Sequence, residues 1–285
     1  MMEKQVNTPI RLFIARFKKQ RIAFVAAIFL LFLFVIAILG DFLTPYDPAE
    51  PDYSNLYAPP SMDHIAGTDS FGRDIFSRII AGTKLSLFVG LASVLLGAVV
   101  GSALGIISGY FGKWIDSIIM RFCDILLAFP GILLAIGIIA ILGPGLMNVV
   151  YAVAIFSVPV FARIVRSSTL SIKSSLYVES ARSIGAKNSR IIMKHILPGT
   201  ISTLIVYFTM RIGSAILIGA GLSFLGIGAD PSSPEWGAML SEGRSYMNTA
   251  PHVTIFPGVA IFLTVLAFNL LGDGLRDALD PKLKD

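Results

Sequence analysis

Several long stretches of this chain contain no charged residue, and they decide what it can fold into. The clearest runs from Ile22 to Leu39 without an Asp, Glu, Lys or Arg. An α-helix needs about 20 apolar residues to cross the hydrocarbon core of a bilayer. Only 14% of the residues are charged, against about 25% in soluble domains, and 55% are hydrophobic. The chain is therefore expected to be an all-α membrane protein.

Six spans are expected, joined by loops of very different lengths. Tight turns at 111–114 and 143–145 separate the second, third and fourth spans. Two hydrophilic segments, residues 41–84 and 226–252, are expected on the same face of the membrane. The spans are predicted at 22–39, 85–110, 115–142, 146–165, 199–225 and 253–271.

The basic segment before the first span raises the question of a cleaved signal peptide, which also begins with positive charge followed by an apolar run. No small-x-small cleavage site closes the run, and further spans follow. The run is therefore interpreted as an uncleaved first span. The transmembrane domain is predicted to cover residues 22–271, with tails at 1–21 and 272–285.

Lys and Arg residues are divided very unevenly between the two faces of this topology. Eighteen fall on the side of the two tails and of the segment between spans four and five, four fall on the opposite side, and Arg211 lies within a span. Cytoplasmic loops carry the excess of positive charge, so both termini are predicted to be cytoplasmic. The net charge of +5 is thus explained by topology, and nucleic acid is not an expected partner.

A polar segment at about 174–197 interrupts the apolar pattern between spans four and five. Ser174 and Ser175 are suitable helix caps, and Glu179 in the first turn suits the helix dipole. Gly185 is expected to end this short helix, and Pro198 to mark the start of the next. An ordinary cytoplasmic loop is the alternative reading of such a segment. Three residues are expected to share one helix face: Tyr177, Ala181 and Ile184.

The residue types and their spacing in this segment form a more specific pattern than an ordinary loop would need. They resemble the EAA motif of importer-type ABC permeases: Glu-Ala-Ala, three residues, Gly, nine residues, Ile, one residue, Leu-Pro. Ser180 replaces the first Ala of that motif and His195 replaces its Ile. In that family the helix docks in a groove on a separate ATPase subunit, where small residues allow close approach. The residues to which the resemblance assigns this coupling role are Glu179, Ser180, Ala181, Gly185, Ala186, Leu197 and Pro198.

The first hydrophilic segment contains a His, two Asp and an Arg close together, which at first sight suggests a metal-binding or catalytic site. The spacing is irregular for metal ligands, and no nucleophile stands beside a base. Gly67 and Gly72 indicate tight turns, with Asp69, Arg73 and Asp74 as hydrogen-bonding anchors.

The same segment, H-x-x-G-T-D-x-x-G-R-D-x-x-S-R, resembles the dipeptide, oligopeptide, glutathione and nickel branch of these importers. Residues 234–240 and 269–281 agree with that branch, and residues 207–252 look closest to glutathione-type permeases. The resemblance implies a bacterial inner-membrane protein whose outer loops dock a substrate-binding protein. The residues expected in that docking region are His64, Gly67, Asp69, Gly72, Arg73, Asp74, Glu235 and Trp236.

Four glycines recur once per helical turn in the second span, which allows another helix to approach to backbone contact. Span-to-span packing and a pore-facing or gating role are both open. The four are Gly97, Gly101, Gly105 and Gly109.

Arg211 lies 13 residues beyond Pro198, roughly 20 Å along a helix. An arginine at that depth needs a partner or water, and it marks a pathway or a fixed ion pair. Asp124 is expected at about 15 Å depth from the same face. It is a candidate partner for Arg211, or for Arg121 one turn away. The alternative is that Arg211 offers its charge to an anionic group crossing the membrane.

No G-x-x-x-x-G-K-[ST] phosphate loop occurs in the chain, so ATP and magnesium are expected only on partner subunits. The resemblance implies a non-enzymatic permease with three kinds of partner: a second homologous permease, two ATPase subunits and a binding protein. Small peptides are the expected substrate, with a nickel-type importer as the alternative. A secondary transporter or channel is a rival, although its coupling acids are sparse here. The second rival is a membrane scaffold or sensor that transports nothing.

Overall fold

The structure is a computed structural model that describes residue 13 and residues 16–279. Within these residues the secondary structure is helical apart from one isolated β-bridge, between Thr68 and Asp74. The helices are α2 (Arg21–Leu43), α3 (Ile75–Phe111), α4 (Lys113–Ala128), α5 (Gly131–Leu142), α6 (Leu146–Lys173), α7 (Leu176–Ser183), α8 (Asn188–Ile191), α9 (Leu197–Phe224), α10 (Trp236–Gly243) and α11 (His252–Leu279).

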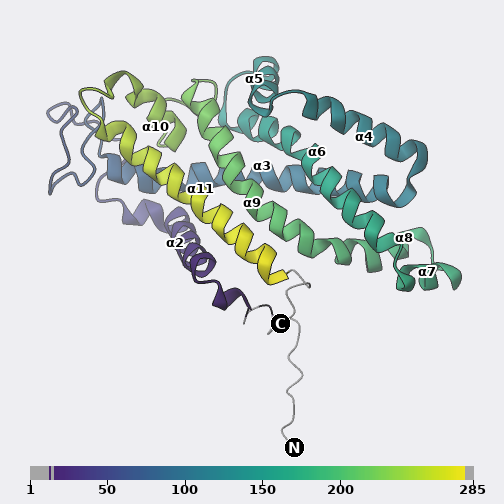
Figure 1. Ribbon diagram of the computed structural model, residues 1–285. Coiled ribbons are helices and arrows are strands. Elements are labelled where there is room, and N and C mark those ends of the chain that lie inside the picture. Colours follow the sequence, from purple (N-terminus) through teal and green to yellow (C-terminus); the bar gives the residue numbers. More distant parts are fainter. Residues whose placement is uncertain (1–12, 14–15, 280–285) are drawn as a thin grey trace, which may run out of the picture.

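The long helices form a bundle with α3 through its middle and α6, α9, α11 and α2 around it (Figure 1). Helix α10 and the long loop before α3 lie at one end of the bundle, and α7 and α8 lie at the other (Figure 1). Five helices of the described chain are long and apolar enough to cross a membrane, or six if α4 and α5 count as one broken span. The predicted all-helical membrane fold is confirmed.

Helix α3 begins ten residues before the predicted second span. The carboxylate of Asp74 caps it, accepting a hydrogen bond from the Ser77 amide at 2.7 Å. The first turns of α3 carry Arg78 and Lys84, and these charges are the reason that the sequence predicted a hydrophilic loop there. Arg78 is nevertheless completely buried, because carboxylates from elsewhere in the chain pair with it. The predicted hydrophilic segment 41–84 therefore ends too late.

The predicted third span is broken in two. Helices α4 and α5 meet at an angle of 94°, and Phe129 between them is extended. Pro130 explains this geometry, because proline lacks an amide hydrogen and disfavours the helical conformation of the residue before it. A straight span at 115–142 was therefore the wrong expectation.

Helix α6 continues to Lys173, well beyond the predicted end at residue 165. Helix α9 begins at Leu197 with Pro198 in its first turn, as predicted, and it continues a helical rod that starts at Asn188. A π-helical turn, Ile192–Ile196, precedes the proline. The wider turn accommodates a residue that cannot donate to the carbonyl four residues earlier.

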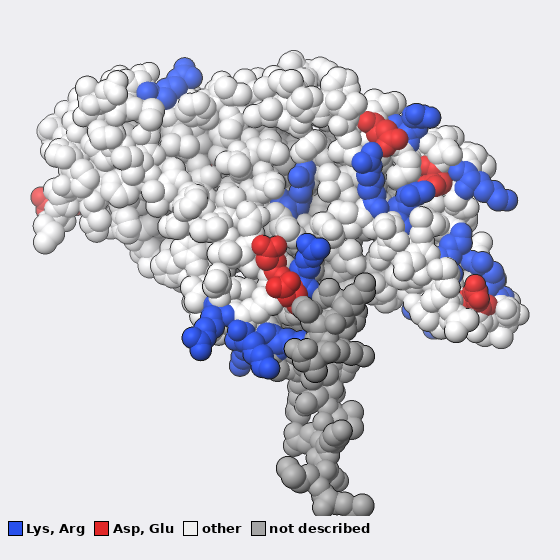
Figure 2. Space-filling view, viewed as in Figure 1, with Lys and Arg blue, Asp and Glu red and all other residues white. Residues whose placement is uncertain are grey.

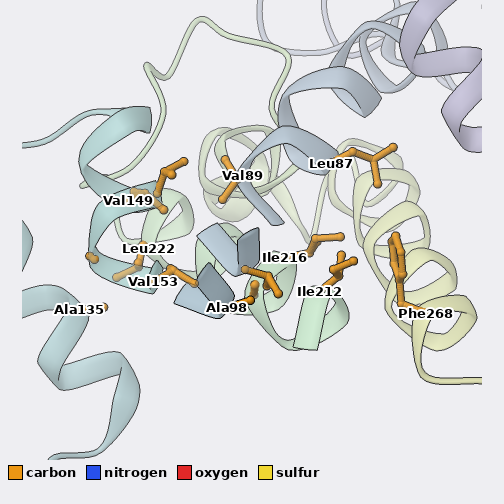
Figure 3. Packing of buried hydrophobic residues seen from close by; sticks show 14 of the residues in the cluster. Leu87, Val89, Ala98, Ala135, Val149, Val153, Ile212, Ile216, Leu222 and Phe268 are labelled. Carbon is orange, nitrogen blue, oxygen red and sulfur yellow. The ribbon is translucent and has the colours of Figure 1, made fainter. Parts of the chain in front are cut away.

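The main hydrophobic core lies where α3, α6 and α9 meet, with Phe268 of α11 at its edge (Figure 3). Leu87, Val94, Val149 and Leu222 are almost fully inaccessible there. A second core lies under the loops near α10, and a third lies at the α7 end. The bundle is thus packed throughout its length.

The four glycines of α3 form its contact with α6. A Cβ added at Gly101 would lie 2.5 Å from the carbonyl oxygen of Val158, and one at Gly105 would lie 2.5 Å from that of Ala162. Gly97 and Gly109 meet Ala154–Ser157 and Arg166–Thr169 in the same way. All four are buried. This row of glycines faces the neighbouring helix, not a pore.

We predict that Gly101→Val lowers the thermal stability of the solubilised protein, because backbone atoms of α6 cannot move aside as a side chain can. The expected loss is about 2 kcal/mol or more in the free energy of unfolding. Gly137→Val is the matched control, since a Cβ at Gly137 on α5 meets nothing within 4 Å. Equal melting temperatures for the two variants would show that the α3–α6 contact is loose.

Candidate functional site

The segment with the EAA-like pattern folds as a short helix, α7, at the tip of the bundle (Figure 1). Gly185 ends it with φ of +80°, a conformation that suits glycine. The Gly185 amide donates to the Arg182 carbonyl and the Ala186 amide to that of Ala181, the paired bonds of a Schellman cap. The predicted end of the helix is confirmed. Ser175 occupies the N-cap position, but its hydroxyl donates back to Ile172 and makes no cap bond.

A small hydrophobic core attaches α7 to the long helices. Val178 is fully buried against Ile106 and Tyr110 of α3, Val165 of α6 and Ile191 of α8. Polar bonds reinforce this attachment. The Tyr110 hydroxyl donates to Asn188 at 2.8 Å, and Lys173 donates to the Tyr110 carbonyl at 2.6 Å. These contacts attach α7 to the ends of α3, α6 and the helical rod that contains α9.

The opposite face of α7 is uncovered and partly apolar. Leu176 is 82% exposed and Ile184 is 85% exposed, with Tyr177 also exposed. Ala181, one turn after Tyr177, is half-buried and packs partly against the small core. Glu179, Ser180 and Gly185 are exposed, Ala186 and Leu197 are half-buried, and Pro198 is exposed on the rod that follows.

Charged side chains gather at the α7 end and near the chain termini, with a broad band almost free of charge between them and the α10 end (Figure 2). This is the pattern of a protein whose middle lies in hydrocarbon. Exposed apolar residues are expected in that band, but α7 lies among the charges. Its apolar face is therefore suited to a protein partner.

At the other end, Asp69 organises a buried ion cluster. Its carboxylate accepts from Arg73 and from Arg78, each at 2.8 Å, and from the amides of Phe71 and Arg73. Glu242, in the last turn of α10, pairs with Arg73 at 2.7 Å. The cluster joins the loop before α3 to α10, which lies about 170 residues later in the chain, and the predicted anchoring role of Asp69 and Arg73 is confirmed.

Turns and caps complete this end of the molecule. Gly67 and Gly72 both have φ of +74°, as the turn prediction requires. Asp74 accepts from His64 at 3.0 Å if the ring is protonated on Nδ1. Glu235 caps α10 through the Ala238 amide at 2.9 Å, and the Trp236 ring nitrogen donates to Ile79 at 3.1 Å.

These bonds leave little surface for docking. Asp69, Arg73, Asp74, Glu235 and Trp236 are each at most 5% exposed. Gly67 and Gly72 are also buried, and His64 is half-buried. The expectation that these side chains form a docking surface is wrong, because they hold the loops together instead. In the same loops the most accessible large apolar residues are Tyr53, Met62, Ile65 and Met247.

Among the described residues, Arg211 has no carboxylate within ion-pair distance. Its guanidinium lies 4.7 Å from the ring centroid of Phe156 on α6, and its Nε and Nη2 atoms are buried without a hydrogen bond. The predicted pairing with Asp124 is wrong, since Asp124 binds Arg163 at 2.6 Å. The alternative pairing of Asp124 with Arg121 is also not found among the described residues. An unpaired buried cation within a span is costly, which makes it a candidate ligand-binding group.

The ion pairs between α4 and α6 were missed from the sequence. Besides Arg163 with Asp124, Arg166 holds Asp116 through two bonds of 2.5 Å. The fourth span was predicted to end at residue 165, so Arg166 fell outside it and neither pair was expected. Helix α6 continues to Lys173 and carries both arginines alongside α4.

Comparisons with known proteins bear on this arrangement. The sequence profile of the family described as "Binding-protein-dependent transport system inner membrane component" matches residues 101–285, and that of the "N-terminal TM domain of oligopeptide transport permease C" matches residues 8–60. A protein of Pectobacterium atrosepticum named "Glutathione transport system permease protein GsiD" is 58% identical over 99% of this chain and 94% of its own length. The protein of the same name from Escherichia coli O6:K15:H31 is 57% identical over 98% of this chain and 93% of its own length.

Solved structures share the fold at low sequence identity. An inward-facing MetNI methionine ABC transporter chain superposes with a TM-score of 0.58 at 20% identity, covering 71% of this chain and 97% of that chain. A chain of an amino acid ABC transporter gives 0.52 at 19% identity, covering 70% and 92%.

We predict that Asp69→Asn weakens the attachment of the loop before α3 to α10, because Arg78 then loses a buried charged partner. Removal of one member of a buried pair costs about 3–5 kcal/mol. Limited proteolysis between residues 44 and 74 should accelerate strongly. Asp63→Asn, an exposed position in the same loop, is the control. Identical cleavage rates in the two variants would contradict the role given to the cluster.

Proposed function

Because this chain belongs to the family of binding-protein-dependent transport system inner membrane components, we propose that the importer of which it is a permease subunit carries short peptides, with glutathione as the favoured substrate. The supporting observation is 58% identity to a glutathione transport permease along nearly the whole of both chains. Transport, not catalysis, is the activity of this subunit. The unpaired Arg211 agrees with an anionic peptide and disfavours a bare nickel cation.

The proposed assembly contains a second, homologous permease, two ATPase subunits and an external substrate-binding protein. The chain would lie in the bacterial inner membrane with both termini and α7 in the cytoplasm. The charge count favours this orientation, as does the gathering of Lys and Arg at the α7 end (Figure 2). The chain itself is proposed to carry no cofactor, and ATP with magnesium would be bound by the ATPase subunits.

Helix α7 is proposed as the contact through which ATP hydrolysis moves the spans. Its outer face offers Leu176, Tyr177 and Ile184 to a groove, and its inner face is anchored by Val178. An apolar centre with a polar rim is the composition expected of a protein interface. When the ATPase subunits close, a pull on α7 would move α3, α6 and α9 together.

The proposal is tested by reconstituting the four membrane-associated subunits in liposomes with the cognate binding protein. Uptake of glutathione is expected to require ATP, the ATPase subunits and the binding protein. Uptake without ATP would favour a secondary transporter instead. Unchanged ATP hydrolysis on addition of binding protein and glutathione would favour a scaffold.

A second prediction concerns α7 alone. Gly185→Leu should uncouple ATP hydrolysis from uptake, because a side chain at φ +80° distorts the end of α7. The surroundings of Gly185 are open, since a Cβ added there would meet nothing within 4 Å. Membrane insertion should be unaffected.

Gly226→Leu is the matched control for that variant. Gly226 has the same φ of +80° and the same open surroundings, but it follows α9 at the α10 end. It should leave the ratio of peptide transported to ATP hydrolysed close to that of the wild type. Full coupling in Gly185→Leu with the ATPase docked would refute the role of α7.

A further inference from the structure

An apolar groove runs along the surface between α2 and α11, which pack side by side (Figure 1). Its volume is about 350 Å³. The two helices touch where Ala23 faces Gly274, since a Cβ added at that glycine would clash with the alanine. Further along, Ala26 of α2 and Ala267 of α11 are each 5% exposed and form the floor of the groove. The small side chains at both positions leave the space that larger residues on either side enclose.

One end of this groove is charged. Of the nine residues that line it, eight are apolar and one is Arg21. Arg21 is the first residue of α2, and its side chain is exposed. Two other apolar grooves on the described spans, one between α3 and α9 and one between α9 and α11, have no charged lining residue. The groove at α2 therefore differs from these two in joining an apolar channel to a cation.

Further positive charge surrounds that end. Figure 2 shows Lys and Arg gathered beside the start of α2. The basic residues there are Arg16, Lys18, Lys19 and Arg21. The ion pairs between described residues all lie elsewhere in the chain. Helix α11 adds Arg276, Asp273 and Asp277, of which Asp277 accepts a hydrogen bond from Gln20 at 3.1 Å. With both carboxylates counted, a net charge of three positive units remains.

The position of Arg21 matches the level of lipid headgroups. Helix α2 has 23 residues, roughly 34 Å, which slightly exceeds the thickness of the hydrocarbon core of a bilayer. The first residue of α2 therefore lies at a membrane–water boundary, and the groove runs from there into the hydrocarbon region. Basic pockets between spans bind anionic lipid headgroups at this level.

The width of the groove favours a single acyl chain over a helix. From Arg21 to Phe29 the groove follows α2 for roughly 12 Å, so a volume of about 350 Å³ corresponds to a mean cross-section of about 30 Å². An α-helix with its side chains is about 10 Å across, which corresponds to about 80 Å². A helix of another subunit would rest on the rim, whereas a hydrocarbon chain is thin enough to enter.

We propose that the groove between α2 and α11 binds an anionic phospholipid, with one acyl chain against Ala26 and Ala267 and the phosphate beside Arg21. The basic residues that precede Arg21 add to the attraction for the headgroup. The lipid fills the space between α2 and α11 and so fastens α2 to the rest of the bundle. This site goes beyond peptide import, and it does not depend on which substrate is carried.

The first test concerns the headgroup. The assembled complex in detergent is given phosphatidylglycerol and phosphatidylcholine with the same acyl chains, and the retained lipids are counted by native mass spectrometry. Phosphatidylglycerol should be retained preferentially. Arg21→Gln should lower that preference roughly fivefold, the equivalent of about 1 kcal/mol for one basic residue near anionic lipid. Arg244→Gln, which removes an exposed charge at the α10 end, is the control and should change nothing. An unchanged preference in Arg21→Gln would overturn the proposal.

The second test concerns the acyl chain. Val25 lines the groove and is 64% exposed, so Val25→Trp should fill the groove without disturbing the core. It should remove one retained phosphatidylglycerol molecule per complex. Ile28→Trp is the matched control, because Ile28 is 54% exposed on the same helix but does not line the groove. Equal retention in the two variants would reduce the site to attraction at the surface and would overturn the placement of the chain.

The same variants distinguish a lipid from a protein occupant. If the second permease covers the groove, Val25→Trp should weaken assembly of the complex and leave lipid retention unchanged, and that result would refute the proposal. Neither test measures transport. A complex that retains the lipid as expected but imports no glutathione would refute the proposed substrate alone.

Discussion

Four glycines of α3 lie in direct contact with the backbone of α6 along most of the length shared by the two helices. Between apolar helices in a membrane the hydrophobic effect gives little attraction, so association depends on such close packing. The contact fixes α6 relative to α3, and α9 packs against both. The ion cluster at the α10 end and the anchor of α7 are both positioned by these three helices.

The two ends of the bundle are stabilised in opposite ways. At the α10 end, Asp69, Arg73 and Arg78 are nearly inaccessible and pair with one another and with Glu242, which makes the loop before α3 and α10 one rigid unit. At the α7 end, one buried valine anchors a helix whose other face leaves leucine and isoleucine exposed. A rigid α10 end and an incompletely covered α7 end suit a subunit that receives motion from one side.

The sequence was sufficient for features that depend on local composition. Apolar runs predicted the membrane spans, and Gly185 predicted the end of α7. Features that depend on distant partners were not predictable in this way. Arg78 looks like a loop residue until Asp69 and Glu242 are seen around it. Arg163 pairs with a residue 39 positions away, and Arg211 finds an aromatic ring in place of the expected carboxylate. The bend at Pro130 and the π turn before Pro198 reflect proline chemistry, whose outcome differs with the surrounding packing.

The central claim is that the exposed face of α7 is the surface through which the energy of ATP hydrolysis enters this chain. Hydrogen–deuterium exchange of the purified permease pair, with and without its ATPase subunits, tests it most directly. The account predicts that amides of residues 176–186 become protected when the ATPase subunits bind, while those of residues 60–74 exchange as before. Unchanged exchange at 176–186 in a complex that hydrolyses ATP would contradict it.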